Sequence, residues 1–181
     1  MWEDEAFGHY VVGQADADSC FCIVVSHSKT YPYGIAVLPL WAIAKTADDE
    51  ILEKVKEFLG VGKIQIVKKP SRDKRRPYSK FVVKGSECGI LVNFFERFPL
   101  RANKRKDFEI WKGAVDLYLS RKRVGGHPDA EIRRASKRCW TKEELIGMLK
   151  LRKQLSQIPS RIKRRIDSVT ERELQRLENI V

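Results

Sequence analysis

The sequence lacks several features that would direct it to other classes of protein. It has no uninterrupted apolar run near the ~18 residues that a membrane-spanning helix needs, so we expect no contact with a membrane. Its four cysteines, Cys20, Cys22, Cys88 and Cys139, form no CxxC pair, and its three histidines are scattered, which argues against a zinc site or a catalytic triad. The acidic start, "MWEDEAFG", does not resemble a signal peptide. We expect an intracellular protein, cytoplasmic or in an organellar matrix, with reduced cysteines.

Positive charge is abundant but unevenly placed. The formal net charge is +12, yet residues 1–60 hold four Lys and Arg against ten Asp and Glu. Residues 61–181 hold the remaining 32 basic residues against 14 acidic ones. Basicity of this strength favours a polyanion as partner, and so nucleic acid over a small-molecule substrate.

Local patterns predict an α+β chain whose first part has the order α-β-β-α-β-β-α-α. The expected helices are 4–18, 46–59 with Thr46 as its cap, 86–98 and 104–121, and the expected strands are 20–28, 33–44, 62–69 and 78–84. Short helices follow, then a helix from Thr141 whose capping box includes Glu144. After Pro159 the charged, helix-prone tail could dock on its own domain, a partner subunit or DNA. We therefore divide the chain into a core (4–122), helices that complete the domain (123–158) and a basic helical tail (159–181).

Strand alternation predicts an apolar face covered by helices and a polar, basic face. Phe21, Ile23, Val25, Ile64, Ile66, Phe81 and Val83 would point to the helices. The opposite face of the second hairpin, with its loop, supplies candidate DNA contacts: Lys63, Gln65, Lys68, Lys69, Arg72, Arg75, Arg76, Tyr78, Lys80 and Lys84. In the first hairpin the same face carries Cys20, Cys22, Val24, Ser26 and Ser28. This face is unusually apolar, so either it contacts the methyl groups of thymine or the assignment of faces in this hairpin is wrong.

Two aspartates stand at the expected end of the first helix, in "YVVGQADADSCF" (residues 10–21). Asp16 and Asp18 oppose the helix dipole there, so a positive group is expected beside them, and a divalent cation such as Mg²⁺ accepts carboxylate ligands. Gly13 and Ala17 share one helix face, where small side chains let a second helix approach. The alternative is a pair of solvated aspartates before a strand.

This segment resembles the signature of the LAGLIDADG homing endonucleases. The matching positions are Gly13, Asp16, Ala17, Asp18 and Phe21, and the departures are Gln14, Ala15 and Ser19. Two further segments, "LGVGKIQI" (59–66) and "FPLRANKRKDFEIWK" (98–112), are also similar to the family, as is the element order. The resemblance covers about residues 8–120.

The resemblance implies an αββαββα fold with a curved antiparallel DNA-binding sheet, here with extra C-terminal helices. It implies a site-specific, intron-encoded endonuclease that cuts both strands of a long double-stranded DNA site. Asp18 and the backbone carbonyl of Ala17 would hold Mg²⁺, with Mn²⁺ as a substitute and Ca²⁺ bound non-productively, and Lys104 would lie near the scissile phosphates. A polar family position falls at Ala44 or Lys45.

A single motif implies a homodimer on a roughly palindromic site. Its interface would include Val12, Gly13, Asp16 and Ala17.

Three alternatives remain at this level. The same fold could serve as an RNA maturase that binds intron RNA, or as a DNA-binding regulator without cleavage. The chain could also be a different basic α/β nucleic-acid binder whose two aspartates are coincidental. An intein is disfavoured, because splice-junction residues are missing from both ends.

Overall fold

The computed structural model describes residues 2–29, 31, 33–46, 49–68, 77–120, 140–156 and 163–180. The elements are α1 (Glu5–Asp18), β1 (Ser19–His27), β2 (Ile35–Lys45), α2 (Asp49–Leu59), β3 (Lys63–Val67), β4 (Tyr78–Lys84), a 3₁₀ turn η1 (Gly85–Glu87), α3 (Cys88–Arg97), α4 (Lys104–Ser120), α6 (Lys142–Ser156) and α7 (Lys163–Glu178). The predicted order is confirmed. Residues 47 and 48 lie outside the description, so the predicted cap at Thr46 is not tested.

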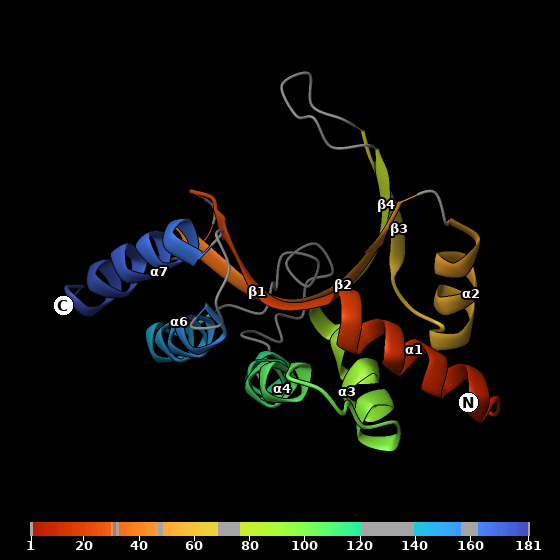
Figure 1. The fold of residues 1–181 in the computed structure, drawn as a ribbon. Coiled ribbons are helices and arrows are strands. Elements are labelled where there is room, and N and C mark those ends of the chain that lie inside the picture. The colour runs from red at the N-terminus through yellow and green to blue at the C-terminus, as the bar shows by residue number, and fades with distance from the viewer. Residues whose placement is uncertain are drawn as a thin grey trace, which may run out of the picture.

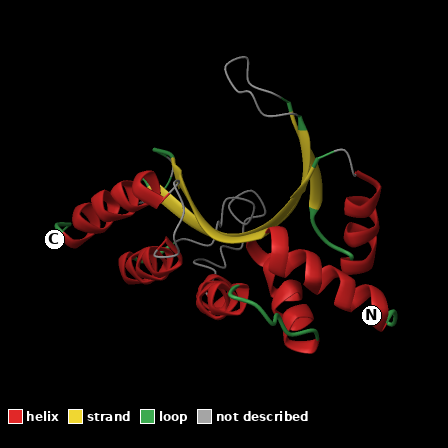
Figure 2. Cartoon of the chain, viewed as in Figure 1, coloured by secondary structure: helices red, strands yellow, loops and turns green. Residues whose placement is uncertain are grey.

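One antiparallel sheet of four strands, in the order β1-β2-β4-β3, organises the chain. The sheet curves strongly, and the helices lie along its convex side (Figure 1). None of the described helices lies on the concave side of the sheet, which we call the trough (Figure 2). The expectation of a curved sheet with one bare face is therefore confirmed.

Aromatic side chains fill the space between the sheet and its helices. Phe21 from β1 and Trp41 from β2 pack edge-on against Phe95 of α3, and Phe21 also contacts Phe108 and Trp111 of α4. All five side chains are buried. Truncating one such ring to alanine typically costs about 3–5 kcal/mol, so this cluster fixes where α3 and α4 sit beneath the sheet.

The predicted alternation is confirmed in β1 and β4 and fails at the end of β3. Phe21 and Ile23 are buried and Cys20 is exposed, which supports the face assignment of the first hairpin. Ile66, predicted to point to the helices, is 72% exposed, because no described helix extends beneath that end of the sheet. Val82 lies on the trough face yet is buried, between Ala42 and Lys63 on the neighbouring strands.

The C-terminal helices build a second hydrophobic cluster beneath β1 and β2. Leu145 and Met148 of α6 and Leu177 of α7 are buried there with Ile23 and Val37 of the sheet. The tail thus docks on its own chain, the first of the three places considered for it.

The predicted capping box opens α6. The Thr141 amide donates to Glu144 Oε2 at 2.9 Å, and the Glu144 amide donates to Thr141 Oγ1 at 3.2 Å. The short helices expected before Thr141 lie outside the described residues. Within the described ranges, no helix has the length and apolar character needed to cross a membrane.

Candidate active site at the end of helix α1

The two aspartates at the end of α1 have different partners. Asp16 accepts hydrogen bonds from the backbone amides of Arg101 (2.9 Å) and Ala102 (3.3 Å), in the connection between α3 and α4. Asp18 accepts one from Lys45 Nζ at 2.8 Å. Residues two apart on a helix point to nearly opposite sides, so one carboxylate holds a loop while the other faces outward. Asp18 is 54% exposed and remains accessible.

Lys45 is the last residue of β2. From the sequence it was, with Ala44, one of two candidates for a polar position of the family. The register of the first hairpin pairs Ser19 with Ile43, so Lys45 lies two residues beyond that pair, beside the end of α1. Its Nζ is the nearest positive charge to Asp18 among the described contacts. Reading the hairpin register from the sequence would have placed this lysine at the site.

Lys104, the first residue of α4, comes close to the same end of α1. The pKa of Cys20 is lowered to about 6, mainly by a hydrogen bond from the Cys22 thiol and also by the charges of Lys104 and Lys80, which together outweigh burial and Asp107. Lys104 and Lys80 thus act electrostatically on Cys20, which follows Asp18 by two residues. The predicted pairing of Asp18 with Lys104 in one region is compatible with this placement.

Asp107, in the first turn of α4, was not singled out from the sequence. It is only 7% exposed, and its Oδ1 has no hydrogen-bond partner among the described groups. Burial raises the pKa of its carboxyl, and the charge of Lys104 opposes that rise. Asp107 therefore places a second carboxyl close to Lys104. The positive charge of Lys104 partly offsets the effect of burial on the pKa of Asp107.

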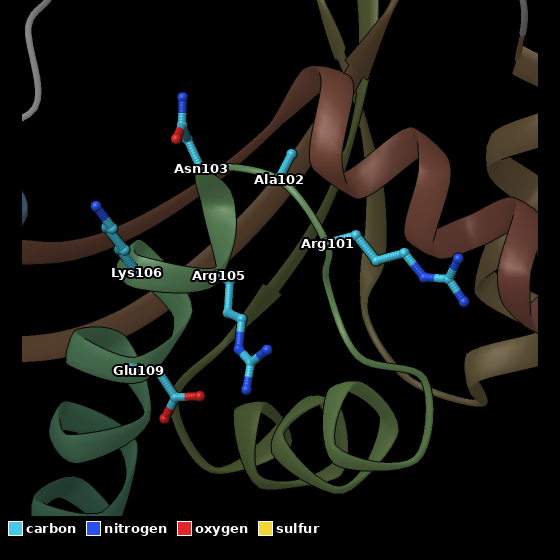
Figure 3. A pocket seen from close by; sticks show the side chains of 6 residues that line it. All are labelled: Arg101, Ala102, Asn103, Arg105, Lys106 and Glu109. Atoms are coloured by element: carbon cyan, nitrogen blue, oxygen red, sulfur yellow. The ribbon is translucent and has the colours of Figure 1, made fainter.

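A basic pocket of about 530 Å³ lies at the connection that Asp16 holds. It is lined by Arg101, Ala102, Asn103, Arg105, Lys106 and Glu109. Figure 3 shows the side chain of Arg101 on the connection and those of Arg105 and Lys106 on the first turn of α4, pointing in different directions. Because none of these three cations forms an ion pair within the described part of the chain, they extend the positive charge outward from Lys104.

The trough face of the second hairpin carries the predicted polar residues. Lys63, Gln65, Lys68 and Lys84 are exposed, while Tyr78 and Lys80 are half-buried. Four predicted phosphate contacts, Lys69, Arg72, Arg75 and Arg76, lie outside the described residues.

The outward face of α1 has small side chains, and none of the described residues covers it. Gly13 and Ala17 are exposed, Tyr10 is 42% exposed, and a Cβ added at Gly13 would meet no atom within 4 Å. Val12, which we predicted in a dimer interface with these residues, is buried in the chain's own core. Asp16 likewise has partners within its own chain.

Comparison with known proteins decides the family. The family model described as LAGLIDADG endonuclease matches residues 11–115, which include the second part of α1, the whole sheet, α2, α3 and most of α4. The chain belongs to the LAGLIDADG endonuclease family. The resemblance noted in the sequence is confirmed.

A curated relative and several solved structures are similar to this LAGLIDADG chain. An uncharacterized 50.9 kDa protein in ND4 intron 1 of Podospora anserina is 23% identical over 118 residues, or 64% of this chain. The chain spans only 25% of that relative's length.

The solved structures support the fold. The homing endonuclease I-TnaI matches with a TM-score of 0.65 at 23% identity, covering 92% of this chain and 97% of that one. An archaeal intron-encoded homing endonuclease complexed with DNA also matches with a TM-score of 0.65. It is 17% identical, and the match covers 94% of this chain and 98% of that one. I-CvuI, solved with its target in the presence of calcium, gives 0.65 at 14% identity over the full length of both chains. The predicted α+β fold class is confirmed.

The residues at the end of α1 fit a divalent cation only in part within one chain. Among the described residues, no group of three His, Cys, Asp or Glu side chains could hold a metal ion. Asp18 offers a hard oxygen ligand, and the last carbonyls of a helix lack intrahelical partners, so Ala17 can add another oxygen. This donor set suits Mg²⁺, which needs only one or two carboxylates, if a second copy of the chain supplies another Asp18.

Proposed function

We propose that this LAGLIDADG protein is a metal-dependent, site-specific endonuclease that cuts double-stranded DNA as a homodimer. One observation carries the proposal: an accessible aspartate, Asp18, is paired with Lys45 at the end of α1, beside a sheet face with basic side chains. Lys104 begins α4 two residues after Ala102, whose amide donates to Asp16. Because the curated relative lies in an intron by its name, we extend the proposal to an intron-encoded enzyme that recognises a long target.

Each site residue has a role that its position supports. Asp18, with the carbonyl of Ala17, would hold the cation, which when bound supplies Lewis-acid activation for phosphodiester hydrolysis. Lys45 holds the Asp18 carboxylate at the end of α1 and adds positive charge there. Lys104 would neutralise the negative charge that develops on the phosphate. The lysines of the trough would bind the DNA backbone, and Gln65 would contact base edges.

The proposed dimer uses the outward face of α1. Two helices that meet at Gly13 and Ala17 can approach closely, since neither residue has a side chain larger than a methyl group. Such an approach would bring the two copies of Asp18 together at the two-fold axis. The predicted target is then roughly palindromic, in keeping with the symmetry of the protein.

Cleavage of DNA tests the catalytic part of the proposal. The purified chain is incubated with duplexes that contain the uninterrupted insertion site of its intron, with Mg²⁺, Mn²⁺, Ca²⁺ or EDTA. We expect a double-strand cut with Mg²⁺ or Mn²⁺, and binding without cutting with Ca²⁺. Asp18→Asn should bind and not cut. Asp116→Asn, the same change at an exposed position of α4, should cut normally.

The outcomes separate this function from its alternatives. Cleavage by Asp18→Asn at the wild-type rate would overturn the assignment of Asp18. Tight binding of intron RNA with no cutting of DNA would favour the maturase, and sequence-specific DNA binding without cutting would favour the regulator.

A substitution at Gly13 tests the dimer. Leu at this position meets no atom near its Cβ and favours a helix over Gly by roughly 0.5–1 kcal/mol, so the folded monomer should melt at or slightly above the wild-type temperature. Its side chain would block a second helix, so sedimentation should show a monomer where the wild type is a dimer. A dimer that persists in Gly13→Leu would place the interface elsewhere.

A further inference from the structure

Helix α7 is tied to the turn of the β1–β2 hairpin by charged contacts. Arg176 donates from Nε to Glu173 Oε2 at 2.7 Å and from Nη2 to the backbone carbonyl of Tyr33 at 2.6 Å. His27, at the end of β1, lies 3.2 Å from Glu173 Oε1 through its Nε2. Glu173 is only 5% exposed. One helix thus holds both ends of the turn, at His27 before it and at Tyr33 after it.

The turn is closed by its own backbone and is also shaped by Arg176. The Ser28 amide donates to the Gly34 carbonyl at 3.0 Å, and the Gly34 amide donates to the Tyr31 carbonyl at 2.9 Å. Gly34 has a φ of +69°, and a Cβ there would lie 3.4 Å from Arg176 Nη1. The guanidinium therefore lies against the backbone at the point where the chain needs glycine to enter β2.

Stability alone gives a weak reason for this arrangement. A buried carboxylate loses hydration, and the attraction of its cations often does little more than offset that loss. Burial acts to raise the pKa of Glu173, but hydrogen bonds from His27 and Arg176 outweigh it and hold the pKa below its ordinary value. The carboxylate thus stays charged and keeps both partners, as a device that fixes a position would require.

The braced turn lies at the outer end of the DNA trough. In Figure 1 the β1–β2 hairpin rises as one wall of the trough, with α7 along its outer side. β1 runs nine residues from Ser19 to His27, so at ~3.3 Å per residue it extends about 30 Å from the end of α1. Because the sheet curves, that length is an upper limit, and at about 3.4 Å per base pair the turn lies no more than roughly nine base pairs from the end of α1 along bound DNA. Lys29 is exposed on the turn.

We propose that Arg176 is a positioning residue that sets the DNA specificity of the β1–β2 turn at the outer base pairs of the target, without acting on the central cut. This inference rests on the proposed endonuclease function. Removing the guanidinium would free the Tyr33 carbonyl and leave Glu173 with fewer cations, so the turn would lose its fixed shape. Contacts at the outer base pairs would weaken, while Asp18 and Lys45 would be undisturbed.

The experiment compares two arginines of the same helix. Arg176→Ala and Arg172→Ala each remove one positive charge. Arg172 contacts Glu173 at 3.5 Å, and it has no hydrogen bond or ion pair with the described residues of the turn. Wild-type protein first selects its site from a randomised duplex pool. Cleavage of that site, and of variants substituted singly at every position, is then measured for all three proteins, together with thermal melting.

For Arg176→Ala we expect discrimination at the outer positions to fall about tenfold, the scale of one base-pair contact. Discrimination at central positions and the cutting rate at saturating DNA should stay within twofold of wild type. Arg176→Lys, which keeps the charge with a single donor group, should restore part of the outer discrimination. Arg172→Ala should leave the profile unchanged.

Three results would overturn the inference. They are an unchanged outer profile in Arg176→Ala, an equal loss at all positions, or the same loss in Arg172→Ala, which would indicate charge alone. Hydrogen exchange of the free protein adds a readout without DNA, in which the turn amides, including that of Gly34, should exchange faster in Arg176→Ala than in Arg172→Ala. Failure of wild-type protein to cut any DNA would remove the proposed function, whereas normal cutting with an unchanged profile would remove only the role of Arg176.

Discussion

Replacing Asp16 by alanine separates the two aspartates of the motif. The carboxylate accepts hydrogen bonds from two backbone amides of the α3–α4 connection. Hydrogen bonds to a charged group contribute about 1.5–3 kcal/mol, and exposure of this pair argues for the lower end. Against this, a negative charge at a helix C-terminus costs about 0.3–1 kcal/mol, which the substitution would recover. The hydrogen bonds outweigh the dipole, so we expect a net loss of about 1 kcal/mol.

Thermal unfolding measures the stability part of this prediction. For a chain of this size, 1 kcal/mol corresponds to a fall in Tm of about 2–4 °C. Asp16→Asn keeps an oxygen acceptor without the charge and should lose less.

Cutting should suffer more than stability does. The connection leads directly into Lys104, and a misplacement of about 1 Å at a catalytic group can cost a hundredfold in rate. Single-turnover cleavage at saturating DNA should therefore fall at least tenfold in Asp16→Ala. An unchanged Tm together with a wild-type rate would show that Asp16 does not hold this connection. A dimer that dissociates while the rate per dimer is kept would instead support the interface role that we predicted for Asp16.

Three further predictions concern other parts of the chain. Alkylation of Cys20 by iodoacetamide, followed by mass spectrometry, should have a midpoint near pH 6 instead of the ordinary 9.0, and Lys104→Ala should move the midpoint upward. Gly62→Ala should lower stability by at least about 2 kcal/mol, since Gly62 has a φ of +89° and the new Cβ would lie 2.5 Å from Phe81, and a wild-type denaturation midpoint would contradict this. The pKa of Glu173 in the folded protein lies below its ordinary 4.5, so its carboxylate stabilises the fold above pH 4.5, and this stabilisation should be lost as the pH falls through the folded pKa. In Glu173→Gln the Tm should therefore fall less steeply with acid than in the wild type. Equal slopes in the two proteins would argue against this role of Glu173.

Most of the fold could be predicted from the sequence, because its elements follow from short-range patterns. The period-two alternation around Phe21 and Phe81 marks the strands and their buried face, and the Thr141–Glu144 pair marks the start of α6. The failure at Ile66 has a plain cause: alternation tells which face a side chain takes, but not how far a helix extends beneath that face.

The site was predicted less completely, because its contacts join segments far apart in the chain. The motif pointed to Asp18 and Gly13, because Asp16 and Ala17, the residues that make them noticeable, lie within four positions of them in the sequence. It could not show that Asp16 holds a connection 85 residues away, or that Lys45 rather than Ala44 reaches Asp18. It also could not show that Val12 is buried, because helical period alone does not say which side of α1 the sheet and the other helices occupy.

The sequence by itself determined the order of the elements, the basic character of the second hairpin and the acids at the end of the first helix. These properties depend on residues within a few positions of one another, where backbone geometry is regular. Only the tertiary structure decided that the tail docks on its own hairpin, through Arg176 and Tyr33 separated by 143 residues. Contacts of that kind depend on how the sheet curves and where its helices lie, and no local pattern encodes either.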